Sequence, residues 1–115
     1  MEIRIVRNSI PKEEIQKLAA EQFGEYVKIV VDVEKNVAAF FGDLHADEEA
    51  LLLSQGSKQE NLWGINFYPA RINDGRIEFD SMINVRPSQG NRTRGVENQA
   101  VREKILGIVN TLIAE

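Results

Sequence analysis

The sequence contains no cysteine among its 115 residues, and only three prolines, one histidine and one tryptophan. Disulfide bridges, thiolate zinc sites, iron–sulfur clusters and cysteine nucleophiles are therefore excluded. No run of apolar residues approaches the roughly 18 that a membrane-spanning helix needs. The first residues, MEIRIVRNSIPKEE, lack the apolar stretch of a signal peptide. These absences predict a cytoplasmic protein that is not attached to a membrane.

What remains is the composition of one globular domain. The chain is 43% hydrophobic and 28% charged, as folded proteins usually are. Since domains run to roughly 100–200 residues, we expect a single domain over residues 1–115. The formal net charge of −4 argues against general nucleic-acid binding, which favours a basic surface.

Periodicity in the first half predicts a strand, a helix and a hairpin. Residues 2–7 alternate as a strand does, and residues 11–24 have a one-sided helical stripe that Gly24 terminates. Two β-rich runs, 26–33 and 37–41, flank a polar turn. A three-residue loop keeps apolar positions away from Asp32, so we expect Val31 to pair with Ala39 and Asn36 to be left-handed. Apolar residues on both faces indicate a central hairpin or a subunit interface.

The second half predicts another hairpin and two helices. Runs 62–69 and 76–86 flank the turn residues Asn73, Asp74 and Gly75, in a register that pairs Ile65 with Ile83. This register leaves one face polar, comprising Gly64, Asn66, Tyr68, Glu78, Asp80, Met82, Asn84 and Arg86. Residues 46–55 favour a short helix, with a strand as the alternative, and residues 98–114 form a helix with a wide apolar face. The order β-α-β-β-α-β-β-α predicts an α+β fold, with two to three helices on a mostly antiparallel sheet.

The most unusual segment is NVRPSQGNRTRGVE, residues 84–97, which holds three arginines and no acid before Glu97. Arginine side chains, free amides and a following helix suit a phosphate, sulfate or carboxylate. The alternatives are a surface loop whose arginines pair with the protein's own carboxylates, and a nucleic-acid patch. The candidate ligand-binding residues are Asp80, Asn84, Arg86, Ser88, Gln89, Asn91, Arg92, Thr93 and Arg94.

The only histidine, His45, lies in the acidic segment DLHADEE, residues 43–49. Histidine beside carboxylates can bind a divalent metal or transfer protons. Candidate metal ligands are therefore His45, Asp43, Asp47 and Glu48, and candidate acid–base residues are His45 and Asp80. The structural alternative is that acids at a helix start simply complement the helix dipole.

Four segments carry a family resemblance. They are LHADEEA (44–50), LWGIN with Tyr68-Pro69 (62–69), IEFDS (77–81) and RPSQGNR with RGVE (86–97). With them, nearly the whole chain resembles a small prokaryotic family classified only as a domain of unknown function. The resemblance implies a bacterial or archaeal source and a standalone domain, and it implies no activity, substrate or cofactor.

Three functional hypotheses follow. The leading one is a binding module for a small anionic ligand at the arginine loop, residues 86–94, without a cofactor. The second is a small hydrolase or transferase, metal-assisted or not, which requires His45 and Asp80 to approach each other across one cleft. The third is a structural homodimer built by the final helix and the two-sided hairpin.

Overall fold

A five-stranded antiparallel sheet lies at the centre of the computed structural model, which describes residues 1–115. Its strand order is β1-β4-β3-β5-β6. The strands are β1 (Arg4–Val6), β4 (Val37–Phe40), β3 (Val27–Asp32), β5 (Leu62–Phe67) and β6 (Ile77–Glu78). A separate parallel pair joins β2 (Ile10–Pro11) to β7 (Ile113–Ala114). The predicted α+β class is confirmed.

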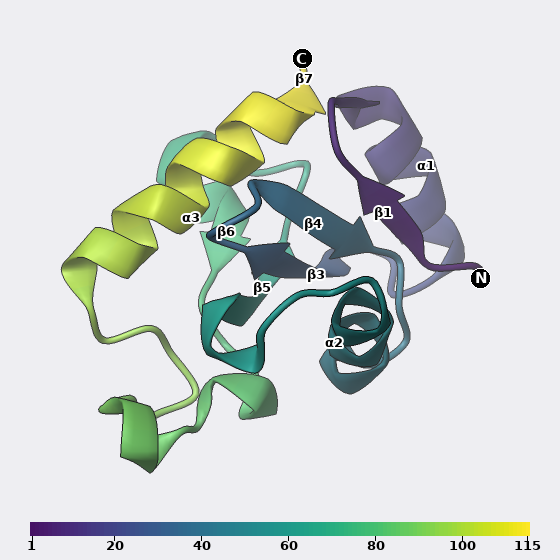
Figure 1. Cartoon of the computed structure of the whole chain (residues 1–115). Helices are drawn as coiled ribbons and strands as arrows, with labels where there is room; N and C mark the ends of the chain where they lie inside the picture. The colour runs from purple at the N-terminus through teal and green to yellow at the C-terminus, as the bar shows by residue number, and fades with distance from the viewer.

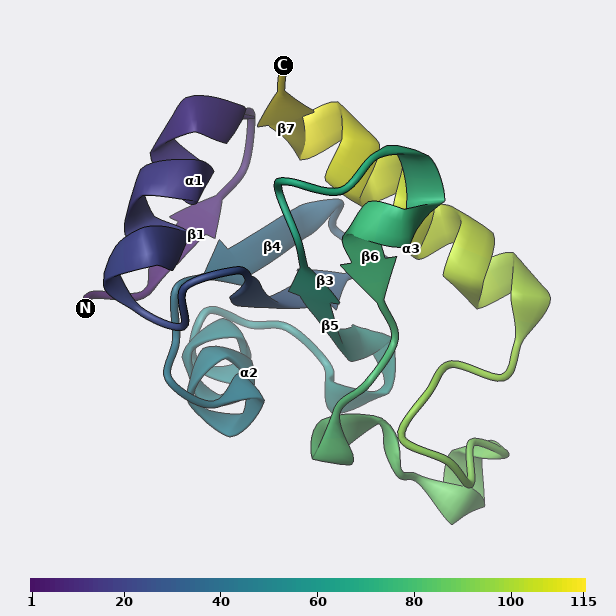
Figure 2. The same cartoon turned by 180° about the vertical axis from the view of Figure 1, so that it is seen from behind.

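Three α-helices cover the sheet: α1 (Lys12–Glu21), α2 (His45–Ser54) and α3 (Gln99–Leu112). Helices α1 and α3 pack on one face and α2 on the other (Figure 1, and from behind in Figure 2). Short 3-10 turns occupy Gln59–Asn61, Asn73–Arg76, Met82–Asn84 and Pro87–Gln89. No helix is both long and apolar enough to cross a membrane.

The predicted helix boundaries rest on local chemistry. Gly24 and Gly56 adopt left-handed backbone conformations after α1 and α2, with φ of 94° and 98°, which glycine adopts without steric cost. The Asn98 side chain accepts a hydrogen bond from the Val101 amide at 3.1 Å and caps α3. The segment 46–55 is therefore a helix, and its strand alternative is wrong.

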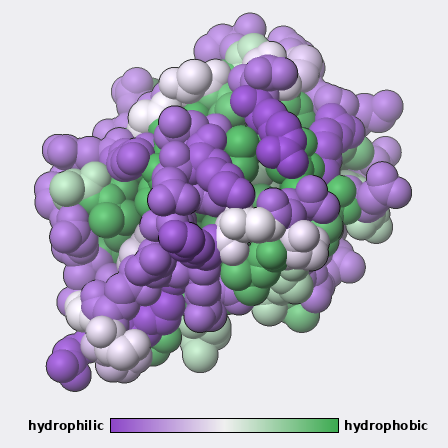
Figure 3. All heavy atoms as spheres, in the orientation of Figure 1, coloured by the Kyte–Doolittle hydropathy of each residue, from purple (hydrophilic) through white to green (hydrophobic).

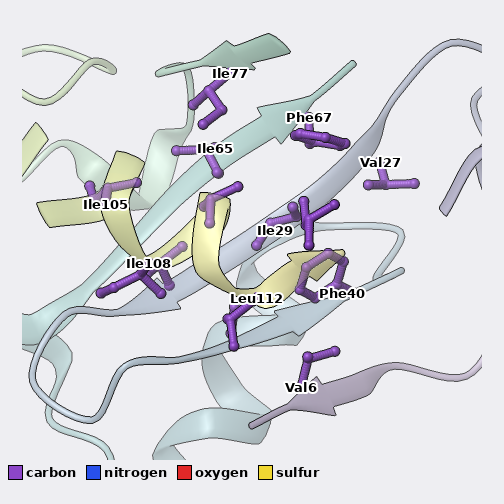
Figure 4. Close-up of a cluster of buried hydrophobic side chains, with 14 of the residues drawn as sticks. Val6, Val27, Ile29, Phe40, Ile65, Phe67, Ile77, Ile105, Ile108 and Leu112 are labelled. Carbon is purple, nitrogen blue, oxygen red and sulfur yellow. The ribbon is translucent and has the colours of Figure 1, made fainter. Parts of the chain in front are cut away.

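Two apolar cores of unequal size lie on the two faces of the sheet. The larger contains 20 buried residues and the smaller contains five. Ile105, Ile108 and Leu112 of α3 point into the larger core toward Ile29 of β3 and Ile65 of β5 (Figure 4). The smaller core receives Leu52 from α2. Both faces of the central hairpin and the wide face of α3 are thus covered within one chain, and these features no longer call for a dimer.

The predicted register of the first hairpin is wrong by one residue. Val31 pairs with Ala38 and Asp32 with Val37, which leaves four loop residues. The prediction kept Asp32 away from apolar positions, yet its carboxylate is fully buried and satisfied. It accepts the amides of Glu34 and Lys35, each at 2.9 Å, and the Ser57 hydroxyl at 2.6 Å. Asn36 does adopt the left-handed conformation, with φ of 58°.

The second hairpin is also shorter and shifted. Asn66 pairs with Glu78 and Phe67 with Ile77, four residues from the predicted register, and β6 ends there. An even shift preserves the faces, so Ile77 enters the core and Glu78 shares the other face with Asn66. The proposed single strand face for Asp80, Asn84 and Arg86 is wrong, because Met82–Asn84 forms a 3-10 turn.

Side chains take over where β6 stops. The Asn84 side chain accepts a hydrogen bond from the backbone N–H of Gly64 at 2.8 Å and donates one to the Gly64 carbonyl at 3.0 Å. A neighbouring strand would make the same two bonds. Arg86 donates to the Leu62 carbonyl at 2.8 Å. Ser81 of the same segment packs so closely on Gly64 that a Cβ there would lie 2.6 Å from the Ser81 side chain. Backbone groups at the edge of β5 are therefore hydrogen-bonded by side chains of residues 84–86, which were predicted to form a strand.

Candidate functional site

A cavity of about 380 Å³ lies between the α2 face of the sheet and the start of α2. Strands β3, β5 and β6, the first residues of α2 and the segment after β6 all contribute to its wall. The side chains that line it and carry chemistry are Tyr26, Lys28, His45, Asn66, Tyr68, Glu78, Asp80, Ser81 and Arg94.

Three of these residues occupy one row across neighbouring strands. Lys28 of β3 pairs in register with Asn66 of β5, which pairs with Glu78 of β6. Asn66 is 6% exposed, and its Nδ2 donates to Glu78 Oε1 at 2.9 Å. The Asn66 Oδ1 atom is buried without any hydrogen-bond partner. Such an unsatisfied buried acceptor is uncommon in folded proteins.

The two charges of the row have different environments. Glu78 Oε1 also accepts from the Tyr68 hydroxyl at 3.4 Å, and the pKa of Tyr68 is raised, mainly by burial and then by the Glu78 charge. The Lys28 ammonium makes no ion pair or hydrogen bond and lies 5.3 Å and 5.8 Å from the ring centroids of Phe23 and Tyr26. The row therefore contains a cation without an anionic partner.

His45 begins α2 and faces the sheet. Its Nε2 lies 2.7 Å from the Ile65 carbonyl oxygen, which can only accept, so Nε2 carries the proton. Burial lowers the pKa of His45 to about 4. The imidazole is therefore neutral at pH 7, and its Nδ1 is available as an acceptor.

An ion pair and apolar groups form the remaining wall and rim. Arg94 Nε donates to Asp80 Oδ1 at 2.6 Å, with both side chains about half exposed. The rings of Tyr26 and Tyr68 lie 5.2 Å apart. Leu44 and Met82, which are 59% and 66% exposed, also line the cavity. Elsewhere, the face seen in Figure 3 is largely hydrophilic, with hydrophobic residues in scattered patches.

The arginine loop is occupied by the chain's own groups. The Glu97 carboxylate accepts hydrogen bonds from the backbone amides of Arg92 and Thr93. Arg86 stacks over Trp63 at 4.1 Å and donates to backbone carbonyls. The loop lies beyond the end of the sheet (green in Figure 1). Of the three arginines in the loop, only Arg94 pairs with a carboxylate, that of Asp80, while Arg86 donates to backbone carbonyls and the Arg92 side chain is exposed.

Other candidates in this segment have structural contacts. Asn91 is buried and its Nδ2 donates to three backbone carbonyls, while its Oδ1 accepts the Glu97 amide. Asn84 supports Gly64 and also donates to the Arg94 carbonyl. Gln89 donates to the Glu60 carbonyl at 2.8 Å, and Ser88 is exposed. Of the nine predicted ligand-binding residues, only Asp80 and Arg94 line the cavity.

The candidate metal ligands do not converge. No group of three or more His, Asp or Glu side chains in the structure could hold a metal ion. Asp43 accepts from the Gln22 amide at 2.9 Å, and Asp47 is exposed in the first turn of α2. Glu48 is fully buried against Gly42, whose amide donates to it at 3.0 Å, and burial raises its pKa.

Sequence reasoning found part of this cavity and missed its cation. Asn66, Tyr68, Glu78 and Asp80 were assigned to one polar face, and His45 was singled out because it is the only histidine. Lys28 was not. The available signal was a single charge inside the apolar strand segment YVKIVV, since a buried strand seldom contains an unpaired lysine.

Comparison with known proteins gives a family. Neither a curated protein nor a solved structure matches the chain. The model of one family, described as "Protein of unknown function (DUF5674)", matches residues 4–112. Because that match covers nearly the whole length, the chain belongs to this family.

Proposed function

We propose that the protein is a binding module and that the cavity beside α2 takes a small molecule carrying an anionic group. The observation that carries this proposal is Lys28, a half-buried cation that lines the cavity and has no anionic partner. A volume of about 380 Å³ suits a small ligand, since ligand pockets start at roughly 300 Å³.

The surroundings of Lys28 favour an anion further. No side chain caps the start of α2, although Asp47 and Glu48 stand in its first turn, and the first amides of a helix attract negative charge. Arg94 uses only its Nε toward Asp80, so its terminal nitrogens remain available at the rim. The site thus combines an unpaired lysine with an arginine that has free terminal nitrogens.

The hydrolase or transferase alternative has one observation in its favour: His45 and Asp80 line the same cavity. Against it, Asp80 is held by Arg94. A histidine with a pKa of about 4 is also a weak base at neutral pH, where the best general bases titrate near the working pH. Binding therefore accounts for the site better than catalysis does.

Isothermal titration and amide NMR with succinate, inorganic phosphate and 3-phenylpropionate test the proposal. We expect at least one of these anions to bind, with resonances of His45 and Asn66 shifting. Lys28→Met should raise the dissociation constant about tenfold or more, as the loss of a charged hydrogen bond does. The matched control is Lys17→Met, at an exposed position of α1. No binding by any anion, or equal binding by both variants, would refute the proposal.

A further inference from the structure

We infer that the ligand is an α-amino acid with an apolar or aromatic side chain, held with its carboxylate at Lys28 and its ammonium at Asn66 and Glu78. This inference rests on the proposed function, because it uses the same cavity and the same cation. It adds the second charge of the ligand and the character of its side chain.

The first step is the arrangement of charge on the row Lys28, Asn66 and Glu78. Neighbouring strands lie roughly 4.8 Å apart, so the backbones of Lys28 and Glu78 are roughly 10 Å apart. Opposite charges stand at the two ends of the row, yet these two side chains form no ion pair. A zwitterion between them places an anion near the lysine and a cation near the glutamate. A dianion or a dication would meet one charge of its own sign.

The second step is the unpartnered Oδ1 of Asn66, at the middle of the row. Glu78 accepts from the Asn66 Nδ2, so the atom without a partner is the amide oxygen. An amide oxygen can accept a hydrogen bond but cannot donate one. A buried acceptor without a donor is unfavourable, and a ligand group that donates removes this cost. A carboxylate cannot donate at neutral pH, whereas an ammonium can. The neighbouring Glu78 carboxylate favours the charged ammonium over a neutral hydroxyl.

The third step concerns the rest of the ligand. The Tyr26 and Tyr68 rings form one wall of the cavity, and aromatic groups pack well against such rings. Leu44 and Met82, both largely exposed, line the same cavity. An apolar or aromatic side chain would cover these groups, which otherwise face water. This favours an amino acid with such a side chain over a small polar one.

Three matched probes separate the parts of the inference: L-phenylalanine, 3-phenylpropionate, which lacks the amine, and 2-phenylethylamine, which lacks the carboxylate. We expect L-phenylalanine to bind at least about tenfold more tightly than either analogue, since each loses one charged contact. Equal binding of L-phenylalanine and 3-phenylpropionate overturns the amino-acid inference and leaves the anion site standing. If L-phenylalanine does not bind, the amino-acid inference is overturned, and the anion site falls with it only if succinate, inorganic phosphate and 3-phenylpropionate also fail to bind.

A variant locates the ammonium. Glu78→Gln keeps an oxygen that can accept from Asn66 and Tyr68 but removes the charge. It should weaken L-phenylalanine binding about tenfold or more and leave 3-phenylpropionate binding unchanged. Glu103→Gln, at an exposed position of α3, is the control. An equal loss for both probes in Glu78→Gln would contradict the assignment, and the wild-type comparison decides the inference even if this variant does not fold.

Discussion

His45 shows how burial can dominate the chemistry of one residue. It is 7% exposed and donates to the Ile65 carbonyl, and burial lowers its pKa from 6.5 to about 4. Because the unfolded chain binds the proton more readily, stability contributed by this group is present above pH 6.5 and is lost as the pH falls toward 4.

We therefore predict that His45 reduces the free energy of unfolding by up to about 3 kcal/mol between pH 6.5 and 4. His45→Gln retains a donor for Ile65 and should remove this contribution, so the difference between the two denaturation curves changes over that range. As there is one histidine, proton NMR follows its imidazole directly. A midpoint near 6.5 would contradict the prediction.

Residues differ in how far the sequence reveals their role. The sequence draws attention to His45 because it is the only histidine. It points to Asp80 through the predicted polar face and to Arg94 through the arginine-rich segment. Asp32 misled the register prediction, since nothing in the sequence shows that the Glu34 and Lys35 amides and Ser57 would satisfy a buried carboxylate. The roles of Lys28 and Glu97 depend on three-dimensional neighbours.

At the scale of elements, side chains of the loop after β6 replace a missing strand. Asn84 is fully buried and satisfies both backbone groups of Gly64 as well as the Arg94 carbonyl. Its replacement leaves several backbone groups without partners, and each buried unsatisfied group costs about 1–3 kcal/mol.

We predict that Asn84→Ala lowers the free energy of unfolding by about 2–4 kcal/mol, measured by chemical denaturation. The Gly64 amide should also exchange with deuterium much faster than the other β5 amides. Asn8→Ala, at an exposed position, should change neither quantity. Unchanged Gly64 exchange in Asn84→Ala would show that Asn84 does not complete this edge.

Elements were predicted better than their pairing. Helix ends were marked by Gly24, Gly56 and Asn98, whose local chemistry decides the backbone on its own. The pairing of β5 with the following segment was not predicted correctly. The connection from Phe67 to Ile77 is longer than the turn that the residues Asn73, Asp74 and Gly75 suggest. Strand registers depend on contacts between distant residues, which periodicity alone does not describe.

At the scale of the whole molecule, the two layers have unequal apolar support. Helix α3 places Ile105, Ile108, Val109 and Leu112 in the large core, whereas α2 contributes only Leu52 to the small one. Regions with few buried apolar contacts open at lower free energy. The proposed cavity is therefore on the less stable side of the sheet.

We predict that native-state hydrogen exchange of α2 is faster than that of α3, and that saturating L-phenylalanine slows α2 selectively. Binding to the native state adds stability that depends on ligand concentration. Mass spectrometry of peptides from each helix measures this, and α3 is the internal control. Equal protection of both helices without ligand would contradict the unequal support.

The pairing of β2 with β7 has a kinetic consequence. It joins Ile10 to Ile113, so nearly the whole chain must be closed into a loop before this contact forms. Closing such a loop costs more entropy than forming a local hairpin, and contacts of this range slow folding. This ladder is therefore expected to form after the folding transition state, where it would retard unfolding without accelerating folding. This ladder of two residue pairs would thus act on the lifetime of the native state.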